Sequence, residues 1–206
     1  MEELFELAVT GILDRGYAVI DGFLNDAEVL TLRKRFLERR AKDAFSPAAI
    51  GQGEESQRVA AIRGDLIYWL EKEEAFPAEV AFINKMEDLM DYLNRTCYLG
   101  VRECEFHYAV YPPGTFYKRH LDQFQKDDAR VLSVVTYLNE EWGTEDGGEI
   151  VLYLPKEGDQ GEIAQKILPI GGRTVLFESG RLEHEVLPTT RDRMSITGWL
   201  RREKIL

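Results

Sequence analysis

The stretch Arg130–Leu138 reads RVLSVVTYL, a run of aliphatic, aromatic and threonine residues that favours a β-strand. Similar short runs lie around it in the second half of the chain, at Phe106–Tyr111, Ile150–Leu154, Arg173–Phe177 and Met194–Arg201. Pro-Pro-Gly, Asp-Gly-Gly, Glu-Gly-Asp and Gly-Gly breaks separate these runs and favour turns. Many short strands joined by such turns are typical of a β-sandwich or barrel of the jelly-roll kind.

The first third of the chain carries helical patterns instead. Phe5, Ala8 and Ile12 recur at helical spacing. Gly16 is placed to end this helix, and Tyr17–Ile20 then favours a short strand. The chain therefore begins with a helix that leads directly into a strand.

Two further helices are predicted from their first residues. Asn25 followed by Glu28 is a capping-box pattern for a helix that runs to about Arg40. Pro77 favours the first turn of a third helix, which we expect to end near Arg95. Helices followed by many strands predict an α+β fold, with a jelly-roll core and supporting N-terminal helices.

The length of 206 residues is typical of a single domain. We expect residues 1–100 to provide mainly helical support and a substrate loop, and residues 101–202 to form the strand-rich core. Ala44–Arg63 is small and polar, which predicts a long loop or a weak hairpin. A loop of this length is either a lid over a site or a surface excursion, and both interpretations stay open.

The composition excludes several classes of protein. Hydrophobic residues make up 44% and charged residues 31%, as in soluble globular proteins. The net charge of −11 counts against a nucleic-acid partner, which requires a cationic surface. The two cysteines indicate no disulfide framework and fit a reducing compartment. Neither a signal peptide nor an apolar stretch of about 18 residues is present, so we expect a cytoplasmic protein without a membrane partner.

His120-Leu121-Asp122, with His184 further along, is the candidate metal site. Two imidazoles and one carboxylate leave half of an octahedral Fe(II) open to a substrate and oxygen. In a strand, residues two apart point to the same face, so we expect His120 and Asp122 to reach one ion. His184 must then come from a distant strand. The chain has three histidines, and we interpret His107 as structural. A surface turn is the alternative for the tripeptide.

A second candidate group lies at the end of the chain. Arg193, Ser195, Thr197 and Trp199 share one face of the predicted strand by their period of two. An arginine and a serine that project into a barrel interior require a buried anion. Arginine binds carboxylates in bidentate fashion, which favours a carboxylate ligand. A surface ion pair is the alternative for Arg193.

These residues resemble the Fe(II)- and 2-oxoglutarate-dependent dioxygenases. More narrowly, they are similar to the prolyl 4-hydroxylases related to the hypoxia-inducible-factor prolyl hydroxylases, including their bacterial members. The resemblance covers residues 60–202, and its Arg-Gly-Asp segment is more specific to this subgroup than the metal motif. The segments that carry it are Ile62–Asp65 with Trp69, Tyr111-Pro112, Tyr117–Asp122, Tyr137–Asn139 with Trp142, Gly147–Glu149, His184–Pro188, Arg193 and Trp199.

The resemblance implies a double-stranded β-helix and a role for each matching residue. The implied iron ligands are His120, Asp122 and His184. The implied 2-oxoglutarate-binding residues are Arg193, Tyr137, Tyr111 and, on the same strand face as Arg193, Ser195. The implied residues of the prolyl pocket are Trp199, Tyr117 and an acidic–basic pair of Asp65 and Arg130. The polar Ala44–Arg63 stretch would be the loop that closes over substrate, and the Tyr111–Tyr117 turn is one residue shorter than in the animal enzymes.

The resemblance also implies a reaction. Oxygen and 2-oxoglutarate would be converted to succinate and carbon dioxide while a hydroxyl group is placed on C4 of a proline in a protein substrate. Ascorbate would be a supporting cofactor. Halogenating relatives lack the carboxylate found here at Asp122, so hydroxylation is expected. For bacterial members the resemblance points to elongation factor Tu as the substrate.

Four other interpretations remain open at this point. The same chemistry would serve an oxygenase of small molecules or of another side chain. A non-catalytic module that binds 2-oxoglutarate would keep the fold, although the intact metal motif counts against it. Zinc would bind the same ligands without redox chemistry. A nucleic-acid demethylase is disfavoured by the acidic charge balance.

Overall fold

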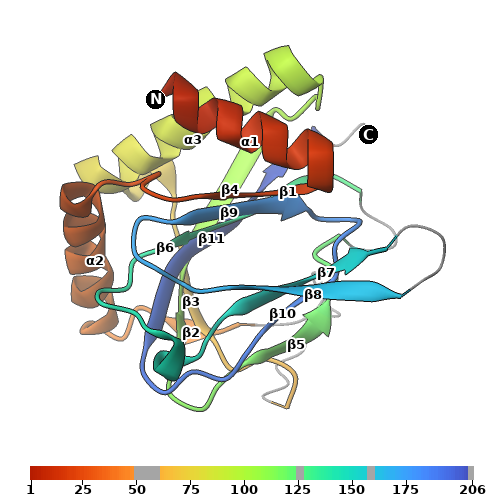
Figure 1. Cartoon of the computed structure of the whole chain (residues 1–206). Coiled ribbons are helices and arrows are strands. Elements are labelled where there is room, and N and C mark those ends of the chain that lie inside the picture. Colours follow the sequence, from red (N-terminus) through yellow and green to blue (C-terminus); the bar gives the residue numbers. More distant parts are fainter. Residues whose placement is uncertain (49–60, 124–127, 157–160, 204–206) are drawn as a thin grey trace.

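The computed structural model describes residues 1–48, 61–123, 128–156 and 161–203 (Figure 1). Its helices are α1 (Glu2–Arg15), α2 (Asp26–Arg40) and α3 (Pro77–Cys97), with short 3-10 helices η2 (Lys72–Glu74) and η3 (Thr144–Asp146). Its strands are β1 (Tyr17–Ile20), β2 (Ser46–Pro47), β3 (Leu66–Trp69), β4 (Glu103–Tyr111), β5 (Tyr117–His120), β6 (Arg130–Tyr137), β7 (Ile150–Pro155), β8 (Glu162–Ile167), β9 (Thr174–Glu178), β10 (His184–Val186) and β11 (Arg193–Arg201).

These strands form two antiparallel sheets that face each other. The larger sheet has seven strands in the order β1-β9-β6-β11-β4-β3-β2, and the smaller has four in the order β5-β10-β7-β8. The helices lie on the outer side of the larger sheet, and the smaller sheet lies on its other side (Figure 1). This architecture confirms the predicted α+β fold with a double-stranded β-helix core.

The larger hydrophobic core lies between the helices and the outer face of the seven-stranded sheet. Leu32 from α2 and Met86 from α3 pack there with Ile196 from β11, each at most 2% exposed. The predicted capping box holds the start of α2, because the side chain of Asn25 accepts a hydrogen bond from the Glu28 amide over 3.0 Å. Helix α1 ends as predicted at Gly16, whose φ of 77° is left-handed.

A smaller core lies between the two sheets and forms the floor of the site. It contains Tyr137 from β6, Phe177 from β9 and Leu152 from β7, all at 0% exposure. Because alternate residues of a strand face opposite sides, Ile196 belongs to the helix side while Thr197 faces the interior between the sheets. The strand alternation predicted for β11 is confirmed.

Strands β3, β5, β8 and β10 were not among the predicted strand runs. β10 is three residues long, and β8 (EIAQKI) is a mostly exposed edge strand, so neither carries a continuous apolar run. β1 and β3 come from the first hundred residues and extend the larger sheet. The first half of the chain therefore contributes strands as well as helices. Of the predicted loop Ala44–Arg63, residues 46–47 form β2 against β3, and residues 49–60 lie outside the described ranges.

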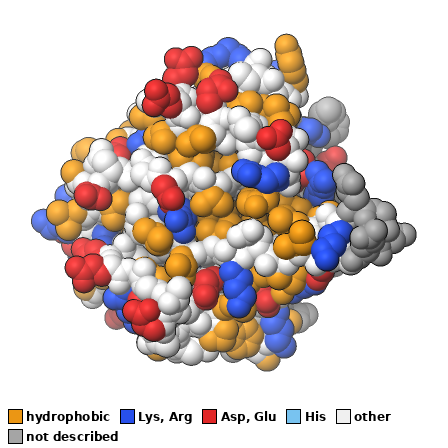
Figure 2. Space-filling view, in the orientation of Figure 1, with side chains coloured by type: hydrophobic (Ala, Val, Ile, Leu, Met, Phe, Trp, Pro, Cys, Tyr) orange, Lys and Arg blue, Asp and Glu red, His pale blue; other side chains and the backbone are white. Residues whose placement is uncertain are grey.

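The surface combines charges of both signs with scattered apolar side chains. Figure 2 shows hydrophobic side chains gathered near the middle of one face, with lysines, arginines and carboxylates around them. Within the described residues, no helix has both the length and the apolar character needed to cross a membrane.

Candidate metal and co-substrate site

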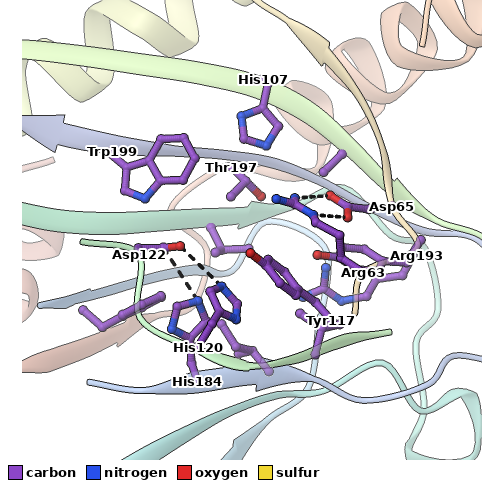
Figure 3. Close-up of a pocket in the computed structure, with 16 residues that line it drawn as sticks. Arg63, Asp65, His107, Tyr117, His120, Asp122, His184, Arg193, Thr197 and Trp199 are labelled. Atoms are coloured by element: carbon purple, nitrogen blue, oxygen red, sulfur yellow. Dashed lines mark hydrogen bonds and ion pairs between the residues drawn. The ribbon is translucent and has the colours of Figure 1, made fainter. Parts of the chain in front are cut away.

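Three potential metal ligands converge at one edge of the smaller sheet, where β5 ends and β10 begins. His120 is the last residue of β5 and pairs in register with His184, the first residue of β10. Nε2 of His120 lies 3.4 Å from Oδ1 of Asp122, and Nε2 of His184 lies 3.7 Å from Oδ2. All three ligand atoms are within 4.8 Å of one another, and Figure 3 shows Asp122 directed at both rings.

The structure corrects the reason why His120 and Asp122 meet. Strand β5 ends at His120, and Asp122 occupies the bend that follows, so the two residues do not share a strand face. The carboxylate is instead held from β6, where Ser133 Oγ donates to Asp122 Oδ2 over 2.7 Å. Ser133 is itself within 2.9 Å of Ser179 Oγ. The predicted convergence is present, but the bend and two serines produce it.

The orientation of both imidazoles fits a metal ion. Nδ1 of His120 lies 2.7 Å from the Lys118 carbonyl, and Nδ1 of His184 lies 3.3 Å from the Leu182 carbonyl. A carbonyl accepts, so Nδ1 carries the hydrogen and the Nε2 lone pair points to the centre of the triad. Two imidazoles and one carboxylate on one side of an ion form the donor set of a non-haem Fe(II) site.

The charge states of the ligands also fit a cation. Burial lowers the pKa of His184 to about 4, so this imidazole is neutral near neutral pH. Burial alone would raise the pKa of Asp122, but His184, His120 and the Ser133 hydrogen bond hold it well below its ordinary value. The triad therefore presents one anionic oxygen donor at Asp122 and a neutral nitrogen donor at His184.

The triad opens into a cavity between the two sheets, and the side chains that form its walls come from both of them (Figure 3). The residues that line it are Arg63, Asp65, His107, Ala109, Tyr111, Tyr117, His120, Asp122, Val135, Ile150, Phe177, His184, Val186, Arg193, Thr197 and Trp199. Charged groups at both ends and apolar side chains between them suit a small dicarboxylate bound against the metal.

Arg193 is the cation at the inner end of this cavity. The residue is 1% exposed, and its Nε donates to the Gly148 carbonyl over 2.7 Å. Gly148 has a φ of 69°, and a Cβ there would lie 3.0 Å from Arg193 Cδ, so the close approach requires glycine. Within the described residues no carboxylate pairs with Arg193. A buried guanidinium without a counter-ion is costly unless an anion binds it.

The two tyrosines and the serine predicted to bind the co-substrate differ in their contacts with Arg193 and the cavity. Tyr137 lies behind Arg193 and is not among the residues that line the cavity. It accepts a hydrogen bond from Arg193 over 3.3 Å, and burial raises the pKa of its phenol, so it stays neutral. Tyr111 lines the cavity, with Arg193 lying 5.1 Å from its ring centre. Ser195 is buried, but its hydroxyl lies 3.1 Å from Thr197 Oγ1 and the residue is not among the cavity-lining set.

Tyr117 connects the metal ligands to the Arg-Gly-Asp segment. Its ring stacks on His120 with centroids 3.6 Å apart, and Arg63 covers it with Cζ 4.3 Å from the ring centre. The Lys118 amide donates to the Ile62 carbonyl over 2.9 Å, which keeps the two segments side by side. Metal ligand, tyrosine and arginine therefore form one continuous stack at the cavity mouth.

The structure corrects the implied pairing of Asp65 with Arg130. Asp65 is bound by Arg63, with contacts of 2.8 and 2.6 Å, because residues two apart on an extended segment share one face. Arg130 instead forms an ion pair with the carboxylate of Glu105, at 3.3 Å. Arg130 also stacks over Trp199, with Cζ 3.4 Å from the ring centre, and donates to the Asp122 carbonyl over 3.2 Å.

Several cavity residues were not predicted from the sequence. Arg63 had no predicted role beyond its place in the Arg-Gly-Asp segment, and nothing in the sequence indicates that Ser133 reaches a metal ligand. Thr197 was placed on the inner face of β11 without a role. His107 was interpreted as structural, yet it lines the cavity. Strand alternation from Tyr111 would have placed His107 on the same face, which is the signal that could have found it.

Comparisons with known proteins support this geometry. The family model described as the 2OG-Fe(II) oxygenase superfamily matches residues 106–201, which include the triad and Arg193. A solved Pseudomonas putida prolyl-4-hydroxylase is 36% identical, with a TM-score of 0.85, over 97% of this chain and 100% of that one. A Trichoplax adhaerens prolyl hydroxylase, solved with a hypoxia inducible factor peptide fragment, is 30% identical, with a TM-score of 0.85, over 97% and 90%.

The similarity to a human protein covers only a part of that protein. Human Egl nine homolog 1 is 32% identical over 143 residues, which are 67% of this chain. The matched region spans 33% of the human protein.

Proposed function

We propose that this chain, which belongs to the 2OG-Fe(II) oxygenase superfamily and is similar to prolyl hydroxylases, is a peptidyl-prolyl 4-hydroxylase. It would use Fe(II), 2-oxoglutarate and oxygen and release succinate and carbon dioxide. The proposal extends an oxygenase assignment that the family membership already carries. What it adds is the substrate class, a proline within a protein.

The position of Trp199 is the observation that carries the prolyl assignment. Its indole lines the cavity beside the metal ligands, and Arg130 covers the ring with Cζ 3.4 Å from its centre. Trp69 extends this aromatic surface outward, with the two tryptophan centroids 6.4 Å apart and Trp69 42% exposed. Aromatic-lined grooves suit proline-containing segments, because such segments are pre-organised and bury an apolar ring.

The two ends of the cavity would bind the metal and the distal carboxylate of the co-substrate. His120, Asp122 and His184 would bind Fe(II), and Arg193 with Tyr137 would bind the distal carboxylate of 2-oxoglutarate. When bound, the iron would activate oxygen with electrons supplied by 2-oxoglutarate, so that one oxygen atom ends in succinate and the other in the new hydroxyl group. The side chains of the protein would have three tasks. Arg193 would neutralise the carboxylate, Asp122 and His184 would bind the metal as an anion and a neutral imidazole, and Trp199 would hold the proline ring.

The residues at the mouth would position the substrate. The contacts from Asp65 through Arg63 and Tyr117 lead to His120, so a peptide bound between Tyr117 and Trp199 would pass directly over the metal site. Asp65 and Tyr117 are therefore proposed as substrate-binding residues, with Arg130 acting through Trp199. Ser195 would support Thr197 rather than contact the co-substrate.

Mass spectrometry of a cell lysate tests the proposal. The purified protein, loaded anaerobically with Fe(II) and 2-oxoglutarate, is exposed to labelled oxygen in the presence of lysate, with purified elongation factor Tu as a parallel substrate. We expect one labelled oxygen on a specific proline. Oxidation of free small molecules without any protein modification would contradict the prolyl assignment while leaving the oxygenase assignment intact.

The metal site provides the control for this experiment. His120→Ala should abolish modification of the same proline, because the iron loses one of three protein ligands. Modification that persists in this variant would come from a contaminating enzyme. If another lysate protein is modified and elongation factor Tu is not, elongation factor Tu is rejected as the substrate and the assignment as a prolyl hydroxylase stands.

A further inference from the structure

His107 occupies the wall of the cavity between two tryptophans. It lies on β4, in register with Trp69 on β3 and with Thr197 on β11. Its ring centroid is 4.7 Å from that of Trp69 and 5.7 Å from that of Trp199. Three neighbouring strands thus carry a continuous row of rings. His107 and Trp199 line the cavity, and Trp69 continues the row towards the solvent. Figure 3 shows His107 and Trp199 on the side of the cavity opposite His184.

Two nitrogen atoms of this surface have no hydrogen-bond partner in the described part of the chain. They are Nδ1 of His107 and Nε1 of Trp199, both fully buried as atoms. The His107 residue is only 3% exposed. Buried polar groups in folded proteins are almost always satisfied, and an unsatisfied one costs about 1–3 kcal/mol. Two such groups in the wall of one cavity therefore indicate a ligand that carries hydrogen-bonding atoms.

The protonation state of His107 defines what it can bind. Burial lowers its pKa to about 4, so at neutral pH the ring is uncharged, with one nitrogen that donates and one that accepts. An uncharged ring does not attract a carboxylate or a phosphate strongly. Trp199 Nε1 can only donate. An uncharged donor and acceptor that point the same way, such as the N–H and C=O of one residue in an extended peptide, match this pair.

We propose that His107 is a substrate-binding residue that, together with Trp199, hydrogen-bonds the backbone N–H and C=O of the residue that follows the target proline. The inference rests on the proposed prolyl hydroxylation and adds to it a determinant of substrate binding. The two ring centroids are 5.7 Å apart, less than the roughly 7 Å spanned by two extended residues, so one short segment passes both rings. Proline itself has no N–H, so the carbonyls and the amide that follows it remain for recognition.

Steady-state kinetics with three variants test this role. The probe is a synthetic peptide of about 20 residues centred on the proline that the wild-type protein modifies in lysate. His107→Leu removes both ring nitrogens at similar volume, and His107→Gln restores a hydrogen-bonding group. Ile196→Val, on the opposite face of β11, is the control for a mild packing defect.

We expect His107→Leu to raise the KM for the peptide about tenfold, the effect of one lost hydrogen bond in a buried site. The Kd for 2-oxoglutarate should stay within about twofold, because the co-substrate binds at the Arg193 end. His107→Gln should recover most of the peptide KM, and Ile196→Val should leave it unchanged.

A second peptide, with an ester in place of the amide after the target proline, locates the contact. The ester should weaken binding to the wild type more than binding to His107→Leu, because only the wild type loses a partner. Equal KM values for the wild type and His107→Leu, or an identical ester effect in both, would overturn the inference and point to an ordered water beside Nδ1. If the wild type modifies no proline, the proposed function fails first, and the inference fails with it.

Discussion

Arg193 donates a hydrogen bond to the phenol oxygen of Tyr137 over 3.3 Å, so a fully buried guanidinium is held by neutral groups. Its other partner, the Gly148 carbonyl, is also neutral. A buried cation held in this way keeps most of its charge available to a ligand, because neither partner cancels it. The carboxylate of 2-oxoglutarate would complete this arrangement.

Arg193→Ala should therefore weaken 2-oxoglutarate binding about 100-fold or more, as expected when a buried charge pair loses one member. Metal affinity should change little, because the triad keeps all of its ligands. Tyr137→Phe removes the hydroxyl that accepts a charge-assisted hydrogen bond from Arg193 and should cost about tenfold in 2-oxoglutarate affinity. Anaerobic titration calorimetry on the manganese-loaded protein measures the Kd for 2-oxoglutarate, and competition with a chelator measures the metal affinity. Equal losses in both constants for Arg193→Ala would remove its assigned role.

Ser133 should tune the metal site although it is not a ligand. Its hydroxyl donates to Asp122 Oδ2 over 2.7 Å and fixes the carboxylate after the end of β5. Loss of such an outer partner typically lowers metal affinity about 10- to 100-fold, and we expect this of Ser133→Ala. Thr136→Val is the matched control, because it removes a buried hydroxyl from the same strand that bonds Thr174 at 2.8 Å instead. An unchanged metal affinity in Ser133→Ala would mean that the bend alone holds Asp122.

The main residues of the site could be predicted because their types are rare or costly. His120 and His184 are two of only three histidines, and a strand that places Arg193 inward implies an anion. The roles of Ser133 and His107 could not be predicted, because each depends on which strands become neighbours. Ser133 meets Asp122 only after β6 and the bend beyond β5 are brought together, and no local pattern encodes that contact.

The same distinction holds for the fold. Helix α2 and strand β6 were predicted because their caps and apolar runs are local signals. β10 has three residues and is defined by its pairing with β5 and β7, not by its composition. The prediction that Asp65 pairs with Arg130 was wrong. A resemblance predicts which residue types are present more reliably than it predicts which side chains contact each other.

The Asp65–Arg63 pair should be important for stability. Both contacts are shorter than 3 Å, and the Asp65 side chain is 1% exposed. Arg63→Met leaves a buried carboxylate without this partner and should lower the free energy of unfolding by about 3–5 kcal/mol. Urea unfolding followed by circular dichroism measures this value.

Two further variants separate the pair from a general effect of removing arginine. Arg63→Met combined with Asp65→Leu should recover most of the stability, because an apolar pair has no charge to desolvate. Arg181→Met removes an arginine that is 61% exposed and pairs with Glu178 at 3.0 Å, and it should cost less than about 1 kcal/mol. Equal losses for Arg63→Met and Arg181→Met would contradict the importance of burial.

The stability of the protein should depend on pH through His107. Burial lowers its pKa from 6.5 to about 4, while Asp65 and Asp122 act to raise the pKa, and Arg63 and Arg130 to lower it. Between these two pKa values the unfolded chain binds a proton that the folded chain does not, so the free energy of unfolding falls as the pH falls. The contribution of His107 is complete above the unfolded pKa. It should decrease by about 2 kcal/mol between about pH 7.5 and pH 5.

Urea unfolding of the metal-free wild type and of His107→Leu at these two pH values isolates this effect. His184, whose pKa is also lowered to about 4, contributes with the same sign in both proteins and cancels in the comparison. The wild type should therefore lose about 2 kcal/mol more than the variant on acidification. Parallel pH dependence in the two proteins would show that the imidazole is protonated as readily in the folded chain as in the unfolded one, and that the cavity around it is wetter than its burial implies.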